Sequence, residues 1–132
     1  MFQFPLSWRT RRAKSPIVPP RITLRSKTMA RVQLIFGRLR PGGLFVSDHE
    51  WDDFVEREIV PQFPVGFTIF SAEGRWQHSS GRFVSDHCKC VVVLYEKSPT
   101  AEGGIEALRA SYKLRFGLES VLRVDDTALV SF

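Results

Sequence analysis

The sequence predicts an α+β sandwich in which two helices pack on one face of a single sheet. Two segments carry apolar residues at helical spacing, and each follows a helix-capping signal. Four extended segments accompany these helices in the order β-α-β-β-α-β, and a short fifth extended segment ends the chain. These observations predict one domain, which the length of 132 residues also allows.

The first strand and the first helix have clear local signals. Residues 31–38 alternate between apolar and polar side chains, which is typical of a strand with one buried face. Ser47 and Glu50 then have the spacing of a capping box, in which each side chain bonds to the backbone N–H of the other residue. Pro61 is expected to end the helix. The apolar stripe of this helix consists of Trp51, Phe54, Val55 and Ile59.

A long hairpin is expected to follow the first helix. Residues 67–77 are extended, with a bulge expected at Gly74, and residues 79–81 turn the chain into a strand over residues 82–96. The end of that strand, residues 90–95, is apolar on both faces, so both faces of the sheet need cover. A sheet-to-sheet homodimer supplies the second cover, as does folding back of the terminal strand, and we favour the homodimer.

The second helix begins after Ser98, an N-cap followed by a proline, and ends at Gly117, where a left-handed C-terminal glycine belongs. A strand over residues 119–124, a turn at residues 125–126 and a last short strand over residues 128–132 complete the chain. The apolar stripe of the second helix consists of Ile105, Leu108, Tyr112 and Phe116.

This order of elements is the split β-α-β pattern of a ferredoxin-like α+β sandwich, here with an extra C-terminal strand. We expect the first and third strands to run parallel and the last main strand to pair antiparallel with the first. The C-terminal end of the first strand then meets the start of the last main strand. Arg38 is therefore expected to lie near Glu119 and Ser120.

Arg38, Ser120 and Arg123 are the candidate ligand-binding residues that follow from this placement. Because arginine presents a fork of donors that fits a carboxylate or a phosphate, we expect a small anionic ligand. For Arg38 itself we favour the other interpretation, an ion pair with Glu119 at the rim of the sheet that has a structural role only.

No pattern in the sequence predicts a catalytic, cofactor or metal site. Cys88 and Cys90 stand one residue apart without a second ligand pair, which falls short of zinc spacing, so we expect no metal. Phosphate-loop, dinucleotide-binding, nucleophile-elbow and zinc-protease motifs are missing. Trp76 and His78, near the hairpin tip, are expected to pack at an edge of the sheet rather than to hold a ligand. We assign no catalytic residue and expect no cofactor.

The charge is divided unevenly along the chain. Residues 1–28 hold seven of the 19 Lys and Arg residues and no Asp or Glu, whereas residues 29–132 hold twelve (19 − 7) against fourteen. Prolines and the lack of a sustained period predict that residues 1–28 are a disordered tail, or an upstream extension that is not native, before a domain over residues 29–132. Because a basic arm also offers phosphate contacts, nucleic-acid binding through the tail is kept as an alternative, although we do not expect it.

A cytoplasmic location is expected. The chain has no run of about 18 apolar residues, so we expect no membrane span. The tail also lacks the apolar stretch of a secretory signal. Cys88 and Cys90 have the pattern of small apolar side chains on a strand, which suits a reducing compartment.

Four blocks of the sequence, taken together and in order, resemble one family. These blocks are Phe36-Gly37-Arg38, Val46-Ser47-Asp48-x-Glu50-Trp51-x-x-Phe54, Pro61-x-Phe63-Pro64-x-Gly66-x-Thr68 and Tyr112-Lys113-x-Arg115-Phe116-Gly117-x-Glu119-Ser120-Val121. They are similar to the uncharacterised bacterial family called domain of unknown function 3574, over about residues 31–132. The family has no established activity, so the resemblance implies no catalytic residue. Many members resemble secreted lipoproteins, which keeps a cell-envelope location open.

The sequence therefore leaves three functions in competition. We expect a small non-catalytic module, dimeric through its sheet, that binds a small anionic ligand or a partner protein. The first alternative is a cofactor-independent enzyme with a cavity on the open face of the sheet, which rests on analogy between folds. The second alternative is nucleic-acid binding through the basic tail.

Overall fold

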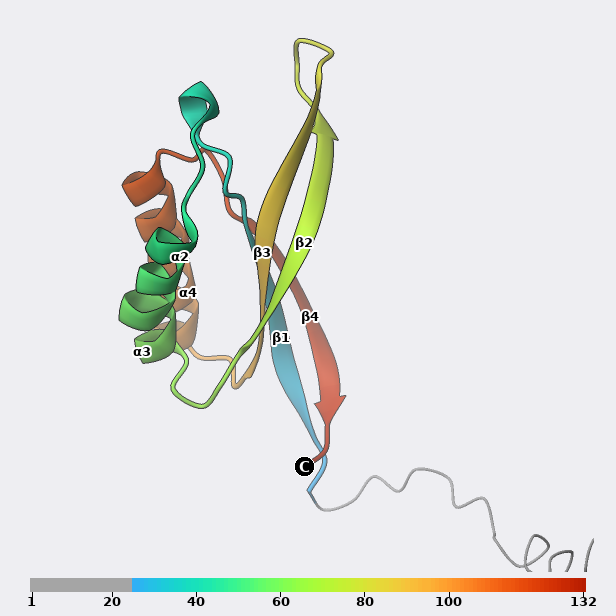
Figure 1. Ribbon diagram of the computed structural model, residues 1–132. Coiled ribbons are helices and arrows are strands. Elements are labelled where there is room, and N and C mark those ends of the chain that lie inside the picture. Colours follow the sequence, from blue (N-terminus) through green and yellow to red (C-terminus); the bar gives the residue numbers. More distant parts are fainter. Residues whose placement is uncertain (1–24) are drawn as a thin grey trace, which may run out of the picture.

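The computed structural model describes residues 25–132. They form one four-stranded sheet with the helices packed against one of its faces (Figure 1). The strands are β1 (Lys27–Phe36), β2 (Thr68–Gln77), β3 (Phe83–Tyr95) and β4 (Leu122–Val130). The helices are α2 (Asp48–Phe54), which continues through a π-helical turn (Val55–Ile59) into α3 (Val60–Gln62), and α4 (Pro99–Phe116). None of the helices in this part of the chain is long and apolar enough to cross a membrane.

The sheet has the strand order β2-β3-β1-β4, and all neighbouring strands pair antiparallel. The prediction that the first and third strands run parallel is wrong. The helical crossover after β1 returns the chain so that β2 runs in the direction of β1, and the hairpin then reverses β3. The prediction of a mixed α+β domain is confirmed at this level: one open antiparallel sheet with helices on one face.

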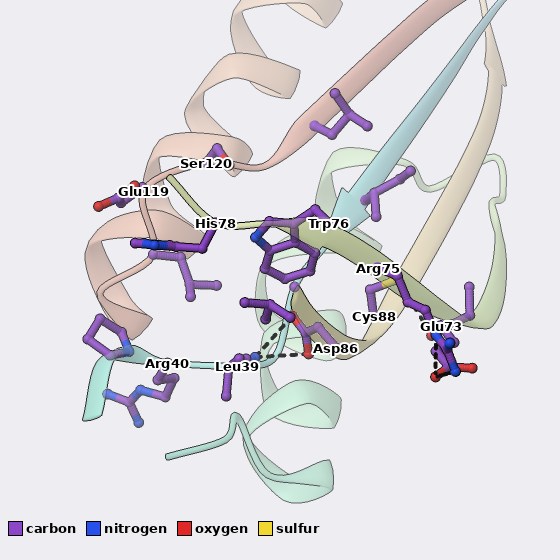
Figure 2. Close-up of a pocket in the computed structure, with 18 of the residues that line it drawn as sticks. Leu39, Arg40, Glu73, Arg75, Trp76, His78, Asp86, Cys88, Glu119 and Ser120 are labelled. Carbon is purple, nitrogen blue, oxygen red and sulfur yellow. Dashed lines mark hydrogen bonds and ion pairs between the residues drawn. The ribbon is translucent and has the colours of Figure 1, made fainter. Parts of the chain in front are cut away.

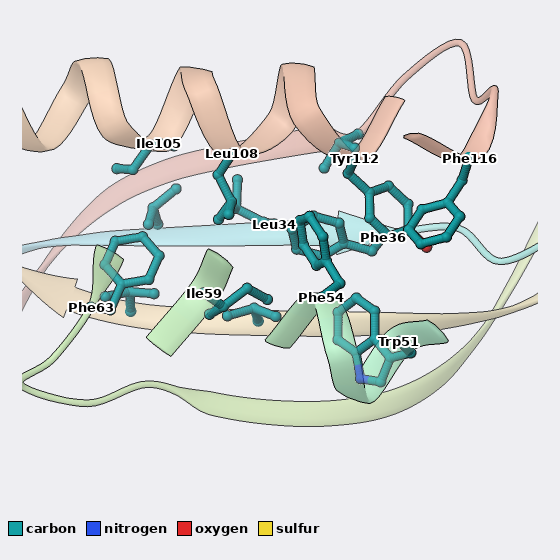
Figure 3. Close-up of a cluster of buried hydrophobic side chains, with 14 of the residues drawn as sticks. Leu34, Phe36, Trp51, Phe54, Ile59, Phe63, Ile105, Leu108, Tyr112 and Phe116 are labelled. Atoms are coloured by element: carbon teal, nitrogen blue, oxygen red, sulfur yellow. The ribbon is translucent and has the colours of Figure 1, made fainter. Parts of the chain in front are cut away.

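Aromatic side chains fill the layer between the sheet and the helices (Figure 3). The ring of Phe36 on β1 lies 4.8 Å from that of Tyr112 on α4 and 5.7 Å from that of Phe54 on α2. Trp51 and Phe116 extend the same cluster. The two apolar helical stripes thus meet over β1.

The helix boundaries agree with the capping signals, except at Pro61. The capping box of Ser47 and Glu50 is present, with the N–H of Glu50 3.0 Å from the Ser47 hydroxyl and the N–H of Ser47 3.1 Å from the Glu50 carboxylate. Pro61 does not end the helix. A π-helical turn precedes it, in which the N–H of Val60 bonds to the carbonyl of Val55, and the helix continues to Gln62. This turn accommodates a residue that has no N–H of its own to donate.

Two strand predictions are wrong. The ladder between β2 and β3 runs unbroken past Gly74, which pairs with Asp86, so there is no bulge. The turn at residues 125–126 and the separate last strand are also absent, because β4 is one strand that stays paired with β1 throughout. Asp126 lies opposite Arg31 and forms an ion pair with it, which overrides the low strand propensity of aspartate.

The start of β1 lies before the expected domain boundary. Lys27 pairs with Val130, and Thr28 with Leu129. The last two residues assigned to the tail are therefore part of the sheet. The rest of the tail prediction, residues 1–24, lies outside the described residues.

The face of the sheet turned away from the helices is mainly apolar, and we call it the open face. Because paired residues point to the same side of a sheet, the register places Cys90 and Leu122 beside Ile35, opposite to the buried Leu34 and Phe36. No helix in the described part of the chain covers this face (Figure 1). Its exposed large apolar side chains are Phe70, Trp76, Leu94, Leu122 and Val124.

Candidate functional site

A hollow of about 880 Å³ lies at the end of the open face where β1 ends and β4 begins. Three segments form its walls: the loop of residues 39–43 after β1, the end of the β2–β3 hairpin, and residues 117–120 between α4 and β4 (Figure 2). The floor is made by side chains of the sheet, among them Ile35, Cys88, Cys90 and Leu122. The site therefore combines an apolar floor with walls that come from distant parts of the sequence.

Trp76 on β2 is the largest side chain of the hollow and lies near the centre of the view in Figure 2. It pairs with Val84 across the hairpin, so both side chains lie on the open face. The indole is 46% exposed, although tryptophan usually contributes most when it is buried. Trp76 lies on β2, an edge strand of the sheet, and its ring lines a concave site there.

Asp86 fixes the loop wall of the hollow. This residue is only 4% exposed, yet its carboxylate accepts hydrogen bonds from the backbone N–H of Arg38 at 3.0 Å and of Leu39 at 3.1 Å. Both oxygens lie within hydrogen-bond distance of both donors. The carboxylate thereby satisfies two N–H groups that leave the sheet as the chain turns into the loop.

Two of the three arginines that line the hollow are engaged by other groups. Arg40 donates to the carbonyl oxygen of Phe116 at 3.1 Å and lies 5.7 Å from the centre of its ring. Arg75 bonds to Glu73 at 3.1 Å. Hydrogen bonds from Ser85 and Arg75 hold the pKa of Glu73 below its usual value. Arg40 and Arg75 therefore each have a partner within the protein.

Arg82 and Glu119 differ from the other charged residues of the hollow. Both line it, and neither side chain has a hydrogen-bond or ion-pair partner among residues 25–132. Arg82 is opposite His78 at the end of the hairpin, where its carbonyl accepts from the His78 N–H at 2.8 Å. The ring of His78 contacts the Ser80 hydroxyl at 3.0 Å.

The structure does not bring together the three candidate ligand-binding residues predicted from the sequence. Arg38 donates to the Val46 carbonyl at 2.9 Å and to Asp48 at 2.7 Å, on the helix side of the sheet. Arg123 also lies on that side, and Ser120 alone lines the hollow. The partners of Arg123 are Asp125, Glu102 and Glu106, and their hydrogen bonds, that of Asp125 above all, raise its pKa.

The strand alternation already contained the signal that places Arg38. Val32, Leu34 and Phe36 face the helices, so the side chain two residues further along faces them too. Arg40, beyond the end of the strand, lines the loop wall of the hollow. The contribution of Arg82 has no local signal, because it depends on how the hairpin folds beside two distant loops.

Potential metal ligands do not converge in the described residues. Within residues 25–132, no group of three or more His, Cys, Asp or Glu side chains is arranged to hold a metal ion. Cys88 and Cys90 are free thiols on the floor of the hollow, and burial raises the pKa of Cys90. Such a thiol is a poor nucleophile near neutral pH.

Comparison with known proteins identifies the family of this chain. The model of the family described as "Protein of unknown function (DUF3574)" matches residues 31–132, so the chain belongs to that family. No curated protein matches it.

The solved structures that are similar to this chain include two of a phage SAM lyase. One, in complex with S-methyl-5'-thioadenosine, has 13% sequence identity and a TM-score of 0.57, with 79% of this chain and 90% of that chain covered. The other, in the apo state, has 15% identity and a TM-score of 0.53, with 87% and 96% covered. At this identity the likeness extends to the fold alone.

Proposed function

We propose that this domain binds a small organic molecule in the hollow on its open face, and that an aromatic ring and an anionic group of the ligand are recognised. The observation that carries this proposal is a concave site of about 880 Å³ that holds both a half-exposed tryptophan and an arginine without a partner. This volume lies in the range of ordinary ligand pockets.

Trp76 is the group that favours an aromatic ligand. Its backbone is held by the β2–β3 ladder, and its side chain has only two rotatable bonds, so little conformational freedom is lost on binding. A flat ligand stacked on the indole would remove apolar surface of both from water, and aromatic pairs contribute about 0.5–1.5 kcal/mol beyond that burial. The apolar floor below the ring supports the same class of ligand.

Arg82 is the group that favours an anionic ligand. A guanidinium without a carboxylate partner presents all its donors to solvent, and it binds carboxylate or phosphate through two parallel hydrogen bonds. Arg40 and Arg75 have less to offer, because their donors are already used by Phe116 and Glu73. This arginine takes the role that the sequence suggested for Arg38 and Arg123.

The proposal is tested with indole-3-propionate, which joins an aromatic ring to one carboxylate. Isothermal titration is expected to show binding to the wild-type protein, with a loss of at least several-fold in affinity in Arg82→Gln and in Trp76→Ala. The matched control is Arg57→Gln, an exposed arginine on the helix side whose guanidinium pairs with Asp53. The proposal is wrong if the wild-type protein shows no detectable binding, or if Arg82→Gln and Arg57→Gln lose the same amount of affinity.

We further propose that the domain is a ferredoxin-like sandwich that forms a homodimer through its open face. The β-α-β-β-α-β order of elements and the placement of the helices on one face support the fold class. On the strands of the open face the exposed charges are paired, Arg31 with Asp126 and Lys27 with Glu96, and most of the other exposed large side chains are apolar. A two-fold interface sets a surface against its own copy, so a face without net charge suits it.

The dimer is tested by sedimentation with a charge placed on the open face. Leu94→Lys is expected to convert a dimer into a monomer, because Leu94 lies among the exposed apolar side chains of that face. Leu114→Lys is the control, since this residue is 88% exposed on α4. A wild-type protein that sediments as a monomer across the micromolar range contradicts the proposal.

An enzyme is the second candidate, and the fold likeness to a phage SAM lyase favours it. The hollow contributes groups that proton transfer could use, among them His78 and Glu119. The direct test is incubation of the protein with SAM, followed by chromatography for S-methyl-5'-thioadenosine. A rate no higher than that of buffer alone counts against this reaction.

A further inference from the structure

We propose that the ligand of the hollow is zwitterionic: besides the anionic group that faces Arg82, it carries a cationic group that faces Glu119. This inference rests on the proposed function and narrows its ligand class. An aromatic molecule with an amino-acid head group is the simplest chemistry that fits.

Most of the charged side chains that line the hollow have a partner within the protein, and two do not. Arg75 is used by Glu73, and Asp86 is used by the backbone of the adjoining loop. Arg40 is used by the Phe116 carbonyl and lies 3.7 Å from the carboxylate of Glu50, which is outside the hollow. The two charged side chains without a partner among residues 25–132 are Arg82 and Glu119, and their charges are opposite.

Arg82 and Glu119 do not satisfy each other. No ion pair or hydrogen bond joins them, although both line the same hollow. Arg82 belongs to the end of the hairpin, and Glu119 belongs to the segment between α4 and β4. Two unpaired charges of opposite sign, supplied by two separate walls, match a ligand that bears both charges.

Glu119 makes a purely anionic ligand a poorer fit. A carboxylate bound to Arg82 brings its negative charge into the same hollow as Glu119, and like charges repel. An ammonium group on the ligand removes this repulsion and gives Glu119 a partner. Because the site is open to water, an added ion pair is expected to strengthen binding about threefold to fivefold rather than by orders of magnitude.

The test compares three probes with one ring and different charges: tryptophan carries both charges, indole-3-propionate only the anion, and tryptamine only the cation. Dissociation constants are measured by isothermal titration with the full chain. Tryptophan is expected to bind about threefold to fivefold more tightly than either of the other probes. In Glu119→Gln this advantage over indole-3-propionate is expected to disappear, whereas Glu56→Gln, an exposed acid on the helix side, should keep it.

The outcomes separate this inference from the proposed function. If indole-3-propionate binds in an Arg82-dependent manner but tryptophan binds no more tightly, the zwitterionic ligand is wrong and the aromatic anion remains. If the preference for tryptophan survives Glu119→Gln, the assignment of the cation to Glu119 is wrong. If none of the three probes binds, this inference falls together with the proposed function.

Discussion

Gly37 and Asp86 are fitted to each other at the edge of the hollow. A methyl group on Gly37 would lie 2.9 Å from the Oδ2 atom of Asp86, which is closer than side-chain carbons approach other atoms. Asp86 cannot retreat, because the N–H groups of Arg38 and Leu39 hold its carboxylate. The glycine thus allows a buried carboxylate to approach the backbone at the point where β1 becomes the wall of the site.

Gly37→Ala is therefore expected to lower the free energy of unfolding by about 1–3 kcal/mol, the range for inserting a methyl group into a packed site. Urea unfolding followed by fluorescence measures this loss. Asp86→Ala is expected to cost about as much, because it leaves the N–H groups of Arg38 and Leu39 unpaired. In the double variant the two losses should not add, and additive losses would show that the two residues are independent.

Tyr112 connects the core to the same edge of the site. Its ring is fully buried among aromatic side chains, and its hydroxyl donates to the Gly37 carbonyl at 2.6 Å. Tyr112→Phe keeps the ring but leaves that carbonyl without its donor, so we expect a loss of about 1–2 kcal/mol in the free energy of unfolding. Removal of the ring in Tyr112→Leu should cost clearly more. Equal stability of wild type and Tyr112→Phe would mean that water replaces the hydroxyl.

Arg123 of β4 forms ion pairs with Glu102 and Glu106 of α4. This network of ion pairs makes the stability of the fold depend on pH in the acid range. Hydrogen bonds from Tyr95 and Arg123 lower the pKa of Glu102 below 4.5, and a hydrogen bond from Arg123 does the same for Glu106. A carboxyl whose pKa is lower in the folded state adds stability above its unfolded pKa. That stability is lost as the pH falls through the folded pKa.

The urea midpoint is therefore expected to be level above about pH 5 and to fall as the pH decreases below 4.5, the ordinary value for these glutamates. Arg123→Gln removes the donor that both share, so its midpoint should change less between pH 5 and pH 3. Arg57→Gln serves as the control, because Arg57 pairs with Asp53 and is not part of this network. It should keep most of the wild-type dependence of the urea midpoint on pH. Identical slopes in wild type and Arg123→Gln would contradict the role of the network.

The sequence was sufficient where structure is determined locally. Ser47 with Glu50 begins the first helix, and Ser98 begins α4. Gly117 ends α4 in the left-handed conformation, with a φ of 71°. These signals concern backbone groups within a few residues of the side chain, so neighbours in the sequence decide them.

The sequence was misleading where distant residues decide. Asp125 and Asp126 have the composition of a turn, but Arg31 on the neighbouring strand keeps Asp126 in the ladder. Local sequence signals say even less about the hollow. Arg82 and Glu119 both line it only because of the way the whole domain folds. Arg38, which the sequence placed beside Ser120, donates to Asp48, because the alternation that buried Phe36 also turned Arg38 towards the helices.

The first turns of α4 contain two glycines that have different surroundings. A methyl group on Gly103 would meet no atom within 4 Å, whereas one on Gly104 would overlap the side-chain amide of Gln62. Gly103→Ala is expected to raise the free energy of unfolding by up to about 1 kcal/mol, because alanine loses less backbone freedom in a helix. In Gly104→Ala the loss of backbone freedom is reduced in the same way, but the methyl group must displace the Gln62 side chain. This variant should therefore be less stable than Gly103→Ala. Urea midpoints of the two variants decide this, and a Gly104→Ala variant as stable as Gly103→Ala would show that the Gln62 side chain moves aside at no cost.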